Sequence, residues 1–160
     1  VGRQGVERRI DVIALAIQKQ ATVYDLEEGE FCYAPPFGTP RDVVNIAGSV
    51  AANVLRKDVE IAHWDQIPTA GDHRPLLVDV RTPGEYAAGA LAGAVNVPLG
   101  ELRRQMDNLP KDREIWVHCA AGQRSYYACR ILKQNGFRAK NLSGGFLTYR
   151  MHEKAANPEK

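Results

Sequence analysis

Apolar residues in the first 57 positions recur every three or four residues, as they do along one face of an amphipathic helix. Two such stripes are present: Val6, Ile10, Ile13 and Ile17 in the first, and Val43, Ile46, Ala47, Val50, Ala51 and Val54 in the second. Each stripe predicts a helix, the second running to about Lys57. A segment of this size is too small to bury both stripes well, because even a domain of about 60 residues is marginal. We therefore expect these helices to pack against another surface.

Local signals mark the ends of these helices. Thr22 and Asp25 have the pattern of a capping box, which predicts a short helix between the two stripes. Residues 31–38 contain two successive prolines, which lack amide donors and push their predecessors out of the helical region, so a loop is expected there. In the segment Thr39–Asp42, the threonine is expected to cap the next helix, with the proline at its first position and the aspartate completing the box.

From about residue 58 the pattern changes to short apolar runs that alternate with helical segments. The runs predict strands at residues 61–63, 76–80, 94–97, 114–118 and 140–142. Helices are expected at residues 83–88, 99–106, 124–135 and 145–154, with a short helical turn at 64–67. Strands that alternate with helices are typical of a parallel sheet covered on both faces. We therefore expect an α/β fold, with one domain at residues 1–57 and a second at residues 58–160.

Composition and charge exclude several classes of function. Val, Ile, Leu and Phe make up 38 of 160 residues, enough to argue against disorder. The longest apolar run, Val12–Ile17, is far shorter than the roughly 20 residues of a membrane span. Twenty-one Lys and Arg are nearly balanced by 19 Asp and Glu, and no dense basic stripe is visible. We therefore expect neither a membrane nor a nucleic-acid partner.

The cysteines and glycines restrict the cofactors. Cys32, Cys119 and Cys129 are too few and too scattered for a disulfide framework or a zinc site. They favour reduced thiols in a cytoplasmic protein without a metal. The chain has no Gly-x-Gly-x-x-Gly, so we expect no dinucleotide fingerprint and no cofactor on this piece.

Cys119 follows the predicted strand 114–118 and precedes a predicted helix. In open parallel sheets, ligands bind beyond the carboxyl ends of the strands. A tight loop at a helix N-terminus offers converging backbone N–H groups and the positive end of the helix dipole, both of which favour the nucleophilic thiolate. We therefore predict Cys119 as the catalytic nucleophile. Its substrate-binding loop is expected to comprise Ala120, Ala121, Gly122, Gln123 and Arg124.

Three further residues have simpler interpretations. Arg81 follows the strand 76–80, and we expect it to form an ion pair with Glu85 or, as a second possibility, to attract the anionic substrate. His118 immediately precedes the nucleophile, so its side chain should point to the opposite face of the strand and be structural. Cys129 is expected to pack in the core, because a resolving thiol needs access.

The segment Cys119–Ser125 resembles the active-site loop of the rhodanese (sulfurtransferase) family. Three further blocks resemble the family in order and spacing: Asp79–Tyr86, Gly93–Pro98 and Asn141–Gly145. The chain departs from the family at Ala90, where many members have histidine, and at Ala120, where arginine often follows the cysteine. The resemblance implies a rhodanese-like parallel sheet flanked by helices. It also implies a sulfurtransferase that moves sulfane sulfur through a Cys119 persulfide, between a small sulfur donor and a thiol acceptor.

The first half has a resemblance of its own. Gly5–Asp11 and Tyr33–Phe37 are similar to the tail of the dimerisation domain in coenzyme A-disulfide reductases, which are flavoproteins of the pyridine nucleotide-disulfide oxidoreductase superfamily. Some members carry a C-terminal rhodanese domain. The resemblance implies that residues 1–57 are a helical remnant of the reductase and that the chain is the C-terminal piece of such a fusion. FAD, NAD(P)H and coenzyme A would then belong to a homodimeric full-length parent with an upstream flavoprotein domain.

Two other functions remain open. Cysteine-based phosphatases and arsenate reductases resemble Cys-x5-Arg, whereas Cys119 and Arg124 are separated by four residues, which narrows the cradle and suits a single sulfur atom better than phosphate. A non-catalytic rhodanese-like interaction module is the other alternative, although such modules often lose the cysteine that this chain retains.

Overall fold

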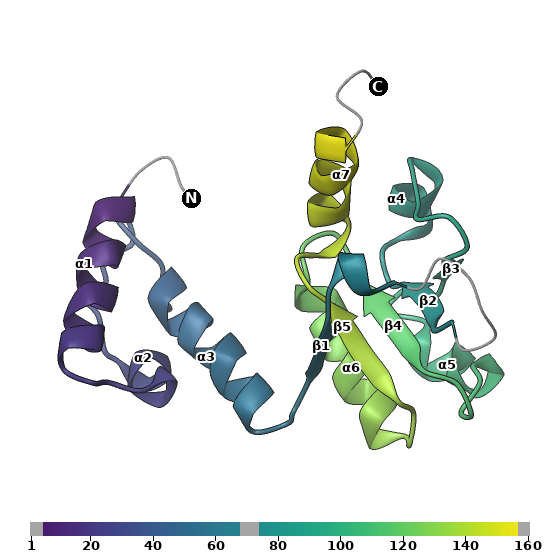
Figure 1. Ribbon diagram of the computed structural model, residues 1–160, viewed down its shortest axis with the longest axis horizontal. Coiled ribbons are helices and arrows are strands. Elements are labelled where there is room, and N and C mark those ends of the chain that lie inside the picture. Colours follow the sequence, from purple (N-terminus) through teal and green to yellow (C-terminus); the bar gives the residue numbers. More distant parts are fainter. Residues whose placement is uncertain (1–4, 68–73, 157–160) are drawn as a thin grey trace. The chain divides into compact units, whose positions relative to one another are not determined.

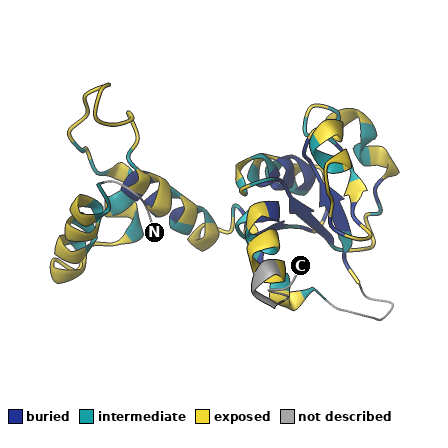
Figure 2. Cartoon of the chain, turned by 90° about the horizontal axis from the view of Figure 1, so that it is seen from above, coloured by how far each residue is buried: buried dark blue, intermediate teal, exposed yellow. Residues whose placement is uncertain are grey.

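The chain divides into two units, Val1–Asp58 and Val59–Lys160. The computed structural model describes residues 5–67 and 74–156 (Figure 1). In the described residues, the first unit consists of helices joined by loops, and the second contains a sheet with its covering helices. Figure 2 shows a contrast in burial: the strands of the second unit are largely buried, whereas much of the first unit is exposed.

The helices of the first unit are α1 (Val6–Gln18), α2 (Val23–Glu28) and α3 (Val43–Leu55). The capping box predicted for Thr22 and Asp25 is confirmed. The predicted start of α3 at Pro40 was wrong. Asp42 caps this helix instead, because its carboxylate accepts a first-turn N–H at 3.0 Å and the Asn45 side chain accepts the Asp42 N–H at 3.1 Å.

Helix α3 packs closely on α2. The buried side-chain amide of Asn45 donates to the carbonyl oxygens of Leu26 at 3.0 Å and of Gly29 at 2.7 Å. Gly48 then leaves room for the α2 backbone, since a Cβ at this position would lie 2.5 Å from the nitrogen of Glu27. A larger residue at position 48 would therefore push the two helices apart.

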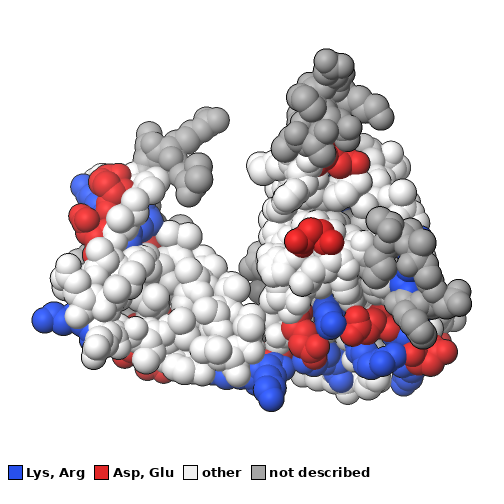
Figure 3. All heavy atoms as spheres, viewed as in Figure 1, with Lys and Arg blue, Asp and Glu red and all other residues white. Residues whose placement is uncertain are grey.

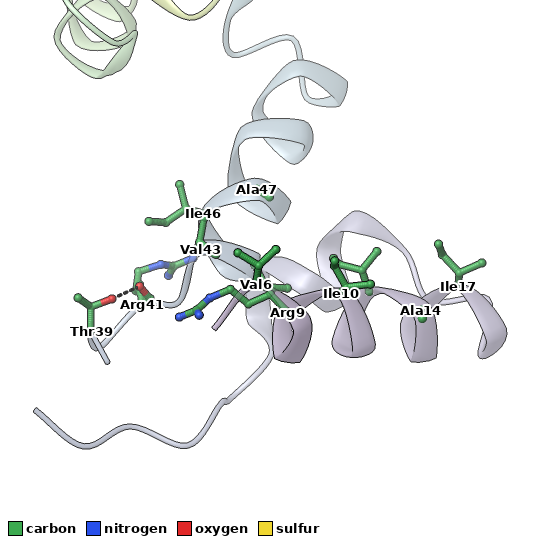
Figure 4. A pocket seen from close by; sticks show the side chains of 12 residues that line it. Val6, Arg9, Ile10, Ala14, Ile17, Thr39, Arg41, Val43, Ile46 and Ala47 are labelled. Atoms are coloured by element: carbon green, nitrogen blue, oxygen red, sulfur yellow. Dashed lines mark hydrogen bonds between the residues drawn. The ribbon is translucent and has the colours of Figure 1, made fainter. Parts of the chain in front are cut away.

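The apolar stripes of α1 and α3 line an open groove of about 790 Å³ (Figure 4). Ile10 and Ile17 on α1 are 60% and 70% exposed, and Ile46 on α3 is 50% exposed. The remaining apolar lining comprises Val6, Ile13, Ala14, Val43, Val44 and Ala47. The stripes predicted from the sequence are thus only partly covered, as expected for a segment of this size.

The described residues of the second unit include five strands: β1 (Glu60–Ala62), β2 (Leu76–Asp79), β3 (Val95–Asn96), β4 (Ile115–His118) and β5 (Ala139–Leu142). They form one sheet in the order β1-β5-β4-β2-β3, and each neighbouring pair is parallel. Strand β4 lies at the centre between β5 and β2, and each of its residues is buried. The α/β fold with a parallel sheet is therefore confirmed, and the strand that leads to Cys119 is its central one.

Helices cover both faces of this sheet. Val117 of β4 packs in one core cluster with Leu132 of α6 (Gln123–Gln134), whereas Trp116 packs in a second cluster with Phe146 of α7 (Gly145–Ala156). Because neighbouring strand residues point to opposite faces, α6 and α7 lie on opposite sides of the sheet. The remaining helical elements are η1 (Trp64–Gln66), α4 (Pro83–Ala87), α5 (Leu102–Gln105) and η2 (Met106–Asn108).

The helix predicted over residues 99–106 is shorter in the structure. Its expected first residue, Leu99, instead lies in a turn before the helix, and its N–H donates to the carbonyl of Val80 at 3.2 Å. Helix α5 therefore begins only at Leu102, and its last turn is a 3-10 helix.

Candidate active site

Cys119 lies directly after β4, at the carboxyl end of the central strand, and is 2% exposed. The chain then turns through Ala120, Ala121 and Gly122 into α6, whose first residue is Gln123. Gly122 adopts a φ of 113°, a conformation that favours glycine because a Cβ would be strained there. The sequence-predicted loop is thus brought around the thiol, with the Ala121 and Gln123 side chains exposed.

Hydrogen-bond donors converge on Cys119 Sγ. The N–H of Gly122 donates to Sγ at 3.1 Å, and the hydroxyl of the fully buried Ser125 lies 3.5 Å away. Burial raises the pKa of the Cys119 thiol, but hydrogen bonds from Ser125, Gly122 and Ala121 outweigh this effect and leave the pKa below its usual value. The direction agrees with the prediction that the loop favours the thiolate.

Arg124 is held by a carboxylate from another element. Its guanidinium makes two hydrogen bonds to Glu85 of α4, at 2.8 and 2.7 Å. The Arg124 guanidinium and the N–H of Thr82 hold the pKa of Glu85 well below its usual range. The charge of Arg124 beside the loop is therefore matched by a fixed negative charge, a pairing that the sequence analysis missed.

The ion pair predicted between Arg81 and Glu85 was wrong. Arg81 pairs with Asp79, at 2.6 Å between Nη2 and Oδ2, and its guanidinium also donates to the carbonyl of Gly89. Its side chain is buried and lies over the ring of Phe146 at 4.2 Å. The reason is that the Arg81 side chain points back to Asp79 at the end of β2, whereas Glu85 lies on α4 and pairs with Arg124. A contact between Arg81 and substrate stays a prediction.

His118 is buried next to Cys119, as part of the core. Its ring lies between Trp64, at 5.7 Å, and Phe146, at 6.1 Å between centroids. Neither ring nitrogen has a hydrogen-bond partner among the described residues, and Nε2 lies 3.8 Å from Asp79. Burial lowers the pKa of His118 and so favours the neutral ring. These contacts agree with a structural residue.

The other two cysteines do not join the loop. Cys129 is fully buried in α6, and burial raises the pKa of its thiol to about 12, so it stays protonated. Cys32 is exposed in the proline-rich loop of the first unit, and its neighbour Tyr33 is also exposed. Ser125 is the residue beside Sγ that the predicted site did not include. The sequence signal that could have identified Ser125 is a small polar residue in the first turn of the helix that follows the Cys119 loop.

Surface charge and hydropathy add little to this site. On the face shown in Figure 3, acidic and basic side chains lie side by side on the second unit rather than gathering by sign. Within residues 5–67 and 74–156, no group of three or more His, Cys, Asp or Glu is arranged to hold a metal. In that same part of the chain, every helix is too short or too polar to cross a bilayer.

A parallel sheet with a cysteine in a donor-lined loop after its central strand defines a recognised class of domain. The rhodanese-like domain family matches residues 64–152, and this chain belongs to that family. A sulfurtransferase of Allochromatium vinosum is 42% identical over 78 residues, which cover 48% of this chain and 73% of that protein. This chain is therefore similar to proteins that are named sulfurtransferases.

Other similarities extend to disulfide and persulfide reductases. A coenzyme A disulfide reductase of Staphylococcus epidermidis is 50% identical over 48 residues, 30% of this chain and 11% of that protein. The reduced Bacillus anthracis CoADR-RHD has a TM-score of 0.89 and 39% identity, over 99% of this chain and 28% of that one. A NAD-dependent persulfide reductase from A. fulgidus has a TM-score of 0.76 and 36% identity, over 90% of this chain and 26% of that one. Both resemblances stated from the sequence are confirmed, and the chain spans about a quarter of these two solved proteins.

Proposed function

We propose that this chain is a sulfurtransferase that carries sulfane sulfur as a persulfide on Cys119. The observation that carries the proposal is the convergence of donors on Sγ, with the N–H of Gly122 at 3.1 Å. Such donors stabilise the thiolate before the reaction and the negative charge of the terminal sulfur after it. The similarity to a named sulfurtransferase supports the same chemistry.

The proposed reaction has two balanced steps. The Cys119 thiolate attacks the outer sulfur of thiosulfate or a low-molecular-weight persulfide, and a new sulfur–sulfur bond forms. The donor's own sulfur–sulfur bond breaks, and sulfite or the donor thiolate leaves with the electron pair. An acceptor thiolate or cyanide then attacks the terminal sulfur, and Cys119 leaves as the thiolate. The enzyme returns to its starting state without an external oxidant or reductant.

The loop residues have distinct proposed roles. The small side chains at positions 120–122 leave room for the added sulfur atom, and the N–H groups of residues 120–124 bind its charge. Arg124 adds a permanent positive charge, which Glu85 holds in place. Ser125 contributes its hydroxyl to Sγ.

We test this function by loading the chain with sulfur from thiosulfate or glutathione persulfide and measuring its mass. The protein should gain one sulfur atom, which peptide mapping should place on Cys119 and which cyanide should remove. Cys119→Ser should abolish the gain. Cys129→Ser and Cys32→Ser should keep it, because neither thiol lies among converging donors.

The same experiment separates the alternatives. Sulfur loading that survives Cys119→Ser would overturn the proposed nucleophile. Hydrolysis of a phosphate ester faster than sulfur transfer would favour a cysteine-based phosphatase. A chain that neither loads sulfur nor hydrolyses the ester would favour a non-catalytic interaction module.

We further propose a setting for this reaction. Residues 1–57 would be the end of a reductase dimerisation domain, and residues 58–160 its rhodanese domain. In such a cytoplasmic homodimer, FAD, NAD(P)H and coenzyme A would bind the upstream flavoprotein domain, and sulfur would pass between the Cys119 persulfide and that domain. The similarity to a coenzyme A disulfide reductase and to CoADR-RHD supports this setting.

A further inference from the structure

One segment of the chain, Asn141–Leu147, binds the outer side of the loop around Cys119. The N–H of Phe146 donates to the carbonyl of Cys119 at 2.7 Å, and the N–H of Leu147 donates to the carbonyl of Ala120 at 3.0 Å. The buried side chain of Asn141, at the end of β5, donates to the carbonyl of Gly122 at 3.2 Å. Three carbonyls of the loop are thus held by donors that do not touch the thiol themselves.

Holding a carbonyl also fixes the N–H of the same peptide unit. A trans peptide is planar, and its C=O and N–H point in opposite directions. The carbonyl of Ala120 points to Leu147, so the N–H of Ala121 must point the other way, to the inside of the loop. The N–H of Ala121 is one of the donors that lower the pKa of Cys119. The bond to the Ala120 carbonyl therefore orients one of the donors inside the loop, and the bonds to its neighbours hold the loop around it.

Gly145 makes this arrangement possible. Its φ is +60°, and a Cβ at this position would lie 2.6 Å from both the Cys119 and the Ala120 carbonyl oxygens. These atoms belong to the backbone, so they cannot move aside as a flexible side chain does. Only a glycine lets the first turn of α7 come close enough to bind both carbonyls.

We propose that Gly145 and the first turn of α7 are positioning elements for the Cys119 loop, which hold its carbonyls outward so that its N–H groups face the sulfur. Their contribution to sulfur transfer rests on the proposed function, whereas their contribution to the state of the Cys119 thiol does not. The two are therefore measured separately.

The test measures how fast iodoacetamide alkylates Cys119 as a function of pH, in a Cys32→Ser background so that the exposed Cys32 does not react. Gly145→Ala should raise the pH midpoint by about one unit, because a hydrogen bond to a charged group contributes roughly that much. Below the midpoint, alkylation should then be about tenfold slower. Gly136→Ala is the matched control, since Gly136 also has a positive φ, 83°, but a Cβ there would meet nothing within 4 Å.

A second pair of variants removes one donor without changing a glycine. Leu147→Pro replaces the N–H that binds Ala120 by a ring, in the first turn of α7, where the backbone N–H has no partner within the helix. It should raise the midpoint as Gly145→Ala does. Leu147→Ala keeps the N–H and truncates a side chain that is already exposed, so it should leave the midpoint unchanged.

Each outcome decides the proposal. A folded Gly145→Ala or Leu147→Pro with a wild-type midpoint would overturn it, as would a Gly136→Ala control that shifts the midpoint equally. If Gly145→Ala does not fold, the midpoint of Leu147→Pro decides whether the proposal holds. If neither variant folds, the proposal is overturned, because the bonds would then stabilise the domain rather than position the loop. If the midpoints shift in the variants but the wild-type chain loads no sulfur, the positioning is supported and the proposed function is rejected.

Discussion

Glu85 and Arg124 set the charge next to Cys119. Each side chain is about one-third exposed, 36% and 35%, so water screens the pair and its contribution to stability is at most about 1 kcal/mol. The pair also acts on the site, because Glu85 first and then the electrostatic interaction with the Cys119 sulfur raise the pKa of Arg124. The pair therefore moderates the positive potential that the loop presents to an anionic donor.

Glu85→Gln should strengthen that potential. It removes one negative charge while the amide keeps a weaker hydrogen bond to Arg124, so the pKa of Cys119 should fall and the KM for thiosulfate should fall severalfold, at most about fivefold. Steady-state sulfur transfer to cyanide measures this change, and thermal unfolding should show a loss of about 1 kcal/mol or less. Glu101→Gln is the control, because Glu101 also pairs with an exposed arginine, Arg104, but lies on the separate α5 segment. A higher KM in Glu85→Gln would contradict this account.

The sequence placed Cys119 in the loop after a strand, but it did not predict the charged partner of Arg124, for a physical reason. Cys119 could be placed at the active edge because strand and loop are consecutive in the chain. The partner of Arg124 could not, because Glu85 is 39 residues away and the pairing depends on where α4 lies. Arg81 was assigned to Glu85, four residues on, whereas its side chain pairs with Asp79, two residues back at the end of β2.

At the scale of elements, hydrophobic periodicity predicted most helices and strands of the second unit. The exceptions are helix ends at which alternative hydrogen bonds compete for the same residues. The predicted strand 114–118 corresponds to β4, Ile115–His118, and the predicted helix 124–135 corresponds to α6. The start of α3 was misplaced because two capping signals lie within a few residues, and the pair of Asp42 and Asn45 forms the more complete box. The predicted helix at 99–106 began too early because Leu99 lies in a turn, where its N–H donates to the carbonyl of Val80.

The length of the loop between β4 and α6 should select the ligand. One glycine inserted after Ala121 would widen the cradle, so sulfur loading should slow about tenfold or more, while phosphate or arsenate should protect Cys119 from alkylation at lower concentration. Mass spectrometry of the persulfide and competition against iodoacetamide measure the two effects.

The control for this insertion is a glycine added after Gly136, in the turn between α6 and β5. This change lengthens a loop that makes no contact with the thiol and should leave sulfur loading near the wild-type rate. Faster sulfur transfer after the Ala121 insertion would show that the narrow cradle does not favour sulfur.

At the scale of the whole molecule, the two units differ in how completely they bury their apolar residues. In the second unit, two core clusters on opposite faces of the sheet bury large side chains such as Leu132 and Trp116. In the first unit, the groove between α1 and α3 leaves Ile10 and Ile17 more than half exposed and Ile46 half exposed, and the face in Figure 3 is largely uncharged there. An apolar surface of this kind in a folded chain marks a site of association.

We predict that this chain self-associates through the groove of its first unit. Ile10, Ile17 and Ile46 are already partly buried, so covering their exposed surface would contribute about 1–2 kcal/mol for each side chain, which offsets part of the free energy lost on association. Sedimentation velocity should therefore show a dimer whose population rises with protein concentration. Ile10→Glu combined with Ile46→Glu should shift the chain to monomer, because two carboxylates would be desolvated in the interface. Sulfur loading at Cys119 should stay unchanged in this variant, since both substitutions lie in the other unit. A wild-type chain that stays monomeric at every concentration, with α1 and α3 folded, would contradict the prediction.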